Sequence, residues 1–248
     1  MANHPEIPPA LIQLLQEAQH VAILTGAGIS AESGVPTFRE AQTGLWAKYD
    51  PQQLATPQAF RQNPKLVWEW YTWRRELVSQ AAPNPGHLAL VKLAELLPTV
   101  TLITQNVDGL HQRAGSQQVI GLHGNIMETK CFSQEHLVAH WPDSEEVPPR
   151  CPICGSFLRP NVVWFGESLP ALALHTAVQS AKSCNLFLAI GTSALVHPAA
   201  TLPLIAVESG ATLVEINPEV TPLTRWADFV LAGPAGTVLP QLVSALQE

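Results

Sequence analysis

A glycine-rich turn at residues 25–39, TGAGISAESGVPTFR, has the composition of a phosphate-binding loop. It follows the apolar run HVAIL, and Gly26, Ala27 and Gly28 would let the backbone approach a diphosphate whose charge a following helix N-terminus could bind. The motif alone is weak evidence, because a tight turn that binds nothing has a similar sequence. The next glycine, Gly34, is too late for the usual dinucleotide fingerprint, and no second strand ending in an acid follows. A conventional hydride-transfer dehydrogenase is therefore disfavoured.

Polar residues that could bind a ligand follow a second apolar run at 99–104. Gln105, Asn106 and Asp108 would be costly to bury unless a ligand or water completed their hydrogen bonds. An Asx turn that caps a helix starting near Asp108 is an alternative and is compatible with ligand binding. His123 lies in the sequence GLHGN. Its imidazole could act as a general base near neutrality, although a lone histidine is more often structural.

The cysteine spacing favours metal binding over disulfides. Cys151 and Cys154 are closely spaced and lie near Cys131, which does not resemble a scattered disulfide framework. Cys184 begins an apolar run and is expected to be a buried structural thiol.

The elements that would position these residues alternate along the chain. Short apolar runs, each followed by turn residues and a helical stretch, occur at 20–28, 99–106, 184–193 and 211–217. Continuous apolar character is typical of parallel strands that are covered on both faces, and it predicts a doubly wound, Rossmann-like α/β fold. Ligands in such folds bind beyond the carboxyl ends of the strands. The sequence therefore predicts one crevice lined by the residues at these strand ends, among them Gly26, Gly28, Gln105, Asn106, Gly191, Thr192, Ser193 and Asn217.

Two segments interrupt this alternation. Residues 40–86 include LVWEWYTWRRELVSQ, which has helical spacing and many aromatic residues, and they are predicted to form a helical insertion. Residues 125–163 carry proline, charge and cysteine, and they are predicted to form a small metal module similar to a zinc ribbon. We expect one domain over 1–248, whose large Rossmann-like part comprises about 1–39, 87–124 and 164–248.

Composition limits the classes of partner. With 13 Lys and Arg against 20 Asp and Glu, the net charge of −7 disfavours binding to nucleic acid. The N-terminal residues do not resemble a signal peptide, and no run approaches the ~20 apolar residues of a membrane span. We expect a monomeric cytoplasmic protein without nucleic-acid or membrane partners.

Six ordered motifs resemble the sirtuin (Sir2) family of NAD-dependent protein lysine deacylases. They are GAGISAESGVPTFR at 26–39, TQNVDGLH at 104–111, LHG at 122–124, VVWFGE at 162–167, GTSALVHPAA at 191–200 and IN at 216–217. Together they are far more restrictive than one glycine loop. The resemblance implies that acetyl groups, and succinyl or malonyl groups, are removed from protein lysines, with release of nicotinamide and O-acyl-ADP-ribose. Protein ADP-ribosyl transfer is an alternative, as is a non-catalytic module that binds NAD or acyl-lysine.

The resemblance also implies roles for single residues. His123 would be the general base and Asn106 a second catalytic residue, whereas His111 is interpreted as structural. Phe38 and Arg39 would close over the cofactor as a mobile lid that excludes water, although Phe38 could be a plain core aromatic. The NAD-binding residues implied by the resemblance are Gly26, Ala27, Gly28, Ser30, Phe38, Arg39, Gln105, Asn106, Asp108, Gly191, Ser193 and Asn217.

Two further segments are implied to bind the acylated substrate. Tyr71 and Arg74 would project from one helix face and resemble the pair by which class III sirtuins bind the terminal carboxylate of succinyl- or malonyl-lysine. The alternative is a surface arginine paired with an acid such as Glu69, which is the interpretation favoured for Arg75. An extended segment would pair with the substrate backbone as an added strand, formed by Val162, Val163, Trp164, Phe165, Gly166 and Glu167.

The metal motif departs from the family pattern. The family usually holds a structural zinc with two Cys-x-x-Cys pairs, but here Gln134 stands where the second cysteine of the first pair would be. Glutamine is a poor zinc ligand, so either His136 or Glu135 would supply the fourth bond, or the site is weak or empty. The expected ligands are the thiolates of Cys131, Cys151 and Cys154.

Overall fold

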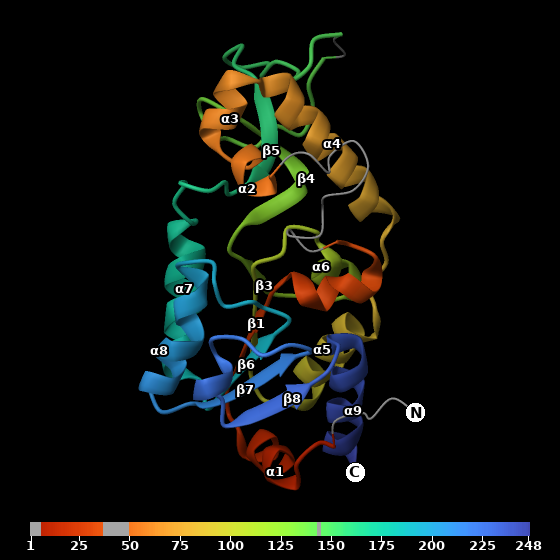
Figure 1. Cartoon of the computed structure of the whole chain (residues 1–248), viewed down its shortest axis with the longest axis vertical. Coiled ribbons are helices and arrows are strands. Elements are labelled where there is room, and N and C mark those ends of the chain that lie inside the picture. The colour runs from red at the N-terminus through yellow and green to blue at the C-terminus, as the bar shows by residue number, and fades with distance from the viewer. Residues whose placement is uncertain (1–5, 37–49, 143–144) are drawn as a thin grey trace.

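A parallel sheet forms the larger part of the computed structural model, which describes residues 6–36, 50–142 and 145–248 (Figure 1). Its strand order is β3-β2-β1-β6-β7-β8, and all neighbours pair in parallel. The predicted doubly wound α/β fold is confirmed, and the four predicted apolar runs contain β1, β2, β6 and β7. The strands are β1 (Val21–Thr25), β2 (Val100–Thr104), β3 (Val119–Gly121), β6 (Leu186–Ile190), β7 (Thr212–Asn217) and β8 (Phe229–Ala232).

Helices cover both faces of this sheet, which explains why β1 is apolar throughout. Val21 and Ile23 pack in one core with residues of α1 (Pro9–Glu17), α5 (Pro85–Leu96) and α9 (Ala235–Gln247). Ala22 and Leu24 pack on the other face with residues of α7 (Ala171–Ser183) and α8 (Leu202–Glu208). Successive side chains of a strand point to opposite faces, so burial on both sides requires an unbroken apolar run.

The two edge strands, β3 and β8, were not predicted from the sequence. β3 has three residues, all half-buried, and in β8 buried and exposed residues alternate. An edge strand has one neighbour and less cover, so it lacks the continuous apolar signal of the central strands.

A second layer lies at the opposite end of the molecule from α1 (Figure 1). Strands β4 (Gly124–Cys131) and β5 (Leu158–Val162) form an antiparallel pair. Their residues Ile126, Val162 and neighbouring Trp164 share a core with Phe60 and Trp70. The helices of this layer are α2 (Pro51–Leu54), α3 (Pro57–Gln62) and α4 (Pro64–Gln80), and the remaining short helices are α6 (Leu110–Ala114), η1 (Ala27–Ser33), η3 (Ala199–Thr201) and η4 (Thr224–Trp226).

Helix α4 confirms the helical spacing of the aromatic segment. Asn63 caps it by accepting a hydrogen bond from the Leu66 N–H, and a proline occupies the first turn. The interpretation of Arg75 as the partner of a surface acid is corrected here. Its guanidinium donates to the carbonyls of Ile126 (2.6 Å) and Glu128 (2.8 Å), where an irregularity between β4 and β5 interrupts the ladder.

The predicted bounds of the Rossmann-like part, the helical insertion and the metal module stay a prediction.

Within the part of the chain that the structure describes, no helix combines the length and apolar character needed to cross a bilayer.

Two buried histidines lie beneath the carboxyl end of β1. The rings of His87 and His111 are 4.9 Å apart between centroids, and both side chains are almost completely buried. His111 Nε2 lies 2.9 Å from the Thr25 hydroxyl, which donates to the Thr104 hydroxyl at 2.8 Å, so Nε2 donates to Thr25. Burial, and then the neighbouring His87, lowers the pKa of His111 to about 3.

This depressed pKa predicts loss of stability in mild acid. The unfolded chain would bind a proton at the ordinary pKa of 6.5, whereas the folded chain resists protonation of His111 to about pH 3. Stability is therefore complete above pH 6.5 and falls below it, by about 2 kcal/mol between pH 7 and pH 5 from this residue. Urea unfolding of His111→Gln should show a correspondingly flatter pH dependence. The exposed His175, changed to Gln, is the control, and equal slopes for the two variants would contradict the prediction.

Candidate active site

The turns that follow β1 and β6 are in backbone contact. The Gly26 N–H donates to Ile190 O (3.0 Å) and the Gly28 N–H to Gly191 O (2.8 Å). A Cβ added at Gly26 would lie 2.7 Å from Gly191 O, and one at Gly28 would lie 2.7 Å from Gly191 Cα. Gly191 itself has φ +56°, and its Cβ would lie 2.5 Å from the Ile29 nitrogen. These glycines are required by the approach of the two turns, whatever ligand the turns bind.

Three of the predicted polar residues meet beside this contact. The buried Ser30 hydroxyl donates to Asp108 Oδ2 at 2.7 Å. The Asn106 amide donates to Ser30 Oγ and to Gly26 O, both at 3.1 Å. Asp108 Oδ1 accepts the Leu110 N–H at 2.9 Å. The Asx turn at Asp108 and the polar cluster therefore coexist, since one carboxylate oxygen serves each.

His123 faces the end of β2, where its orientation fixes its tautomer. Its Nδ1 lies 2.8 Å from the Gln105 carbonyl oxygen. A carbonyl only accepts, so Nδ1 carries the proton and Nε2 is the basic nitrogen of the neutral ring. Burial lowers the pKa of His123 below 6.5, and the hydrogen bond to Gln105 partly offsets this. The imidazole is therefore neutral near pH 7 and can accept a proton at Nε2.

Thr192 joins three strand ends. It lies within the predicted strand end 191–193 but was not among the predicted NAD-binding residues. Its hydroxyl accepts from the Gln105 amide at 2.9 Å, and its carbonyl accepts from the Asn217 amide at 3.0 Å. Its position between Gly191 and Ser193 in the GTS sequence was the available signal. The ends of β2, β6 and β7 thus form a connected polar edge, as the strand-end argument predicted.

The segment 162–167 departs from the expected extended conformation in its second half. The Val163 N–H donates to His123 O at 2.9 Å, which places the start of the segment beside the catalytic candidate. The chain then turns: Gly166 has φ +88°, and the Glu167 N–H donates to Trp164 O at 3.0 Å. The prediction of an extended strand through Glu167 is therefore wrong. After the turn, the Glu167 carboxylate faces back into the protein, where it pairs with Arg159.

Tyr71 and Arg74 lie on one face of α4, as predicted from their spacing. The Tyr71 hydroxyl accepts a hydrogen bond from the Trp164 indole N–H at 3.0 Å, and burial raises the pKa of the phenol to about 12. The Arg74 guanidinium lies 5.0 Å from the Trp70 ring centroid and borders a small pocket. Burial lowers the pKa of Arg74, whereas Tyr71 and Asp108 raise it. The predicted lid residues Phe38 and Arg39 lie outside the described residues.

Two of the three predicted metal ligands, Cys131 and Cys151, converge with His136. The ligand atoms of Cys131, His136 and Cys151 all lie within 4.8 Å of one another. Cys154 Sγ is 3.4 Å from Cys131 Sγ, and His136 Nε2 is 3.4 Å from Cys151 Sγ. These separations are close to the roughly 3.5–3.8 Å between ligands of a tetrahedral zinc with bonds of about 2.0–2.3 Å. Glu135 instead forms an ion pair with Lys130.

The thiol chemistry also suits a cation. Burial raises the pKa of Cys151, but hydrogen bonds from the backbone of Cys154 and Ile153 and from His136 outweigh burial and lower this pKa to about 6. A thiolate is the form that binds zinc, so the cluster of Cys131, His136 and Cys151, with Cys154 beside Cys131, fits a structural zinc.

Comparison with known proteins identifies the family of this chain. The family model described as Sir2 family matches residues 26–198. An NAD-dependent protein deacylase of Aquifex aeolicus (strain VF5) is 52% identical over 233 residues, 94% of this chain and 97% of that protein. The crystal structure of a Sir2 homologue–NAD complex has a TM-score of 0.92 at 45% identity and covers 100% of this chain and 96% of that one. A mutant Sir2 homologue in complex with 2′-O-acetyl ADP ribose has a TM-score of 0.90 at 46% identity, covering 97% of both chains. The chain therefore belongs to the Sir2 family.

Proposed function

We propose that this protein is an NAD-dependent protein-lysine deacylase. The observation that carries the proposal is the orientation of His123, whose Nδ1 is fixed by the Gln105 carbonyl so that Nε2 is the basic nitrogen. The full-length similarity to a protein deacylase and to complexes with NAD and 2′-O-acetyl ADP ribose supports the same reaction. No feature of the described site favours ADP-ribosyl transfer over deacylation.

The polar strand ends fit the charged and hydroxylated parts of NAD. NAD supplies the ribose carbon that receives the acyl oxygen when nicotinamide leaves. Asn106, Ser30 and Asp108 offer amide, hydroxyl and carboxylate groups for the nicotinamide and ribose end. His123 Nε2 takes a proton from a ribose hydroxyl, and the imidazole is suited to this because burial keeps it neutral.

His123→Ala should lower turnover by about 100- to 10,000-fold, the usual contribution of a general base, while the unfolding midpoint is retained. In the wild type, the acid limb of kcat/KM should lie below pH 6.5, because burial depresses the pKa of the base. Nicotinamide release and mass spectrometry of an acetyl-lysine peptide measure both. The exposed His175, changed to Ala, is the control. Near wild-type turnover of His123→Ala, or a mass gain on the peptide, would contradict the proposal.

We also propose that Tyr71 and Arg74 bind acyl groups that end in a carboxylate. The half-buried Arg74 guanidinium and the protonated Tyr71 phenol interact electrostatically in a poorly solvated place, where a carboxylate gains most from a guanidinium. A neutral acetyl group would not use the charge. Succinyl- and malonyl-lysine are therefore the substrates that the pair would select.

Arg74→Met should reduce kcat/KM for succinyl-lysine peptide by roughly 10- to 100-fold, the loss expected for hydrogen bonds to a charged group. Activity on the acetyl peptide should change little. Arg61→Met is the control, because Arg61 is an exposed arginine of α3 whose guanidinium lies beside the Phe132 ring. An equal loss on both peptides in Arg74→Met would show that Arg74 does not select the acyl group.

We propose Cys131, His136, Cys151 and Cys154 as the ligands of a structural zinc. The four side chains come from the two ends of the segment between β4 and β5, so the ion would join these ends. A closed set of four protein ligands is typical of structural sites.

His136→Ala should lower the zinc content from one ion per chain and reduce the unfolding temperature. Glu135→Ala should retain the metal, because the neighbouring carboxylate pairs with Lys130 and not with the thiols. Elemental analysis after dialysis against a chelator measures the content. Unchanged zinc in His136→Ala, with loss in Glu135→Ala, would reassign the fourth ligand.

A further inference from the structure

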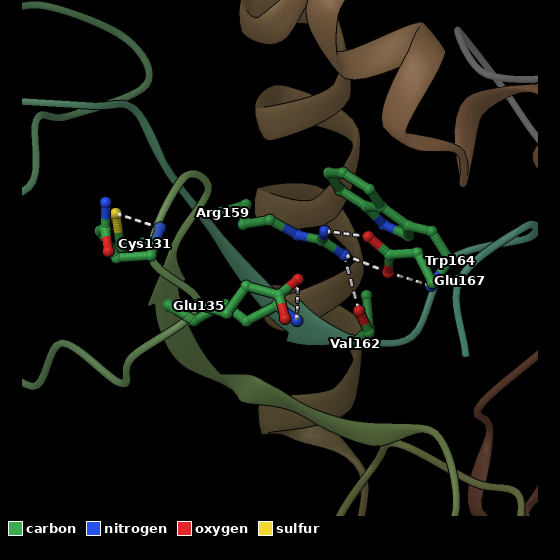
Figure 2. A network of polar contacts seen from close by, with 8 residues as sticks. Cys131, Glu135, Arg159, Val162, Trp164 and Glu167 are labelled. Carbon is green, nitrogen blue, oxygen red and sulfur yellow. Dashed lines mark hydrogen bonds and ion pairs between the residues drawn. The ribbon is translucent and has the colours of Figure 1, made fainter. Parts of the chain in front are cut away.

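A buried ion pair lies next to the segment 162–167. Arg159 in β5 is 1% exposed, and its guanidinium binds the Glu167 carboxylate with two hydrogen bonds, of 2.5 and 3.0 Å. Arg159 Nη2 also donates to the Val162 carbonyl at 2.7 Å. Figure 2 shows the guanidinium between this carbonyl and the carboxylate. The pair therefore joins the end of β5 to the turn that follows it.

The same pair fixes Trp164 at its backbone and at its ring. Glu167 Oε2 accepts the Trp164 backbone N–H at 2.8 Å. The Arg159 guanidinium carbon lies 3.2 Å from the Trp164 ring centroid, and the side chain of Trp164 is 1% exposed (Figure 2). A stacked guanidinium held by a carboxylate leaves the indole little freedom to rotate.

Trp164 in turn determines the direction of the Tyr71 hydroxyl. The indole N–H has only a donor, so the phenol oxygen accepts at this contact, which is 3.0 Å long. The phenol proton must then point to a different partner. Tyr71 lies three residues before Arg74 on α4, so both groups act on the same side of the helix.

We propose that Arg159, Glu167 and Trp164 are positioning residues that aim the Tyr71 hydroxyl at the carboxylate of the acyl group. The inference rests on the proposed function. A buried ion pair is often no better for stability than apolar residues of similar volume, because desolvation of the charges offsets their attraction, so stability alone does not account for this pair. Lys130 stands opposite Arg159 in the β4–β5 ladder, where Arg159 repels it and the carboxylates of Glu167 and Glu135 attract it. Fixing Trp164 is the role that the contacts support.

Trp164→Phe tests the inference with little risk to the fold, because it keeps an aromatic ring and removes the indole N–H. The KM for succinyl-lysine peptide should rise about fivefold, as expected for the loss of one neutral hydrogen bond. The rise should be larger than any change in KM on the matching acetyl peptide, because an acetyl group has no carboxylate for the Tyr71 hydroxyl to bind. Trp226→Phe, at a residue that is 49% exposed, is the control.

A double-mutant cycle separates positioning from a general structural role. If Trp164 acts through Tyr71, then Trp164→Phe should cause no further loss on succinyl peptide in a Tyr71→Phe background. Additive losses would overturn the inference.

The ion pair is tested by removing both charges together, because a single change would leave the other charge buried without its partner. The variant with Arg159→Met and Glu167→Gln should unfold cooperatively and raise the KM for succinyl peptide more than for acetyl peptide. If the wild type removes succinyl groups and these variants keep its KM for succinyl peptide, the inference is overturned and the proposed function stays intact. A wild type that removes acetyl but not succinyl or malonyl groups would overturn the acyl assignment and the inference with it.

Discussion

Two turns approach each other so closely that three glycines are needed where they touch. The turn after β1 hydrogen-bonds to the turn after β6, and side chains at Gly26, Gly28 or Gly191 would collide with backbone atoms. These strands are neighbours at the centre of the sheet. The chain crosses from one half of the sheet to the other between them, and a crevice opens at such a point. The position of the Asn106 side chain depends on this contact, because its amide donates to the Gly26 carbonyl.

Buried polar groups around this contact are satisfied largely by one another. Ser30 links Asn106 to Asp108, and Thr192 links Gln105 to Asn217. Each bond removes part of the cost of burying a polar group, and each also fixes a side chain before a ligand arrives. The site is therefore organised by the fold, and binding need not order these residues.

The sequence predicts the centre of the fold and much of the site, because both leave local patterns. Continuous apolar runs identify β1, β2, β6 and β7, and their polar ends identify the crevice. Other features depend on contacts between distant segments. His136 and Glu135 are equally close to the cysteines in sequence, and only the turn after β4 brings one imidazole to the thiols while the carboxylate meets Lys130. Likewise Arg74 and Arg75 are adjacent in the sequence, but the turn of the helix directs the Arg75 side chain to the carbonyls of β4.

The β4–β5 register connects the cluster of cysteines and His136 to α4, the helix that carries Tyr71 and Arg74. Cys131 stands opposite Leu158, and the next pair along the ladder is Lys130 with Arg159. A shift of this register by one residue would move Arg159 to the other face of the pair, away from Glu167 and Trp164. Cys131 at the end of β4 and the Arg159 guanidinium in β5 therefore require the same register of the two strands. Because Arg75 of α4 binds the irregular part of β4, the helix that carries Tyr71 and Arg74 is held to this alignment as well.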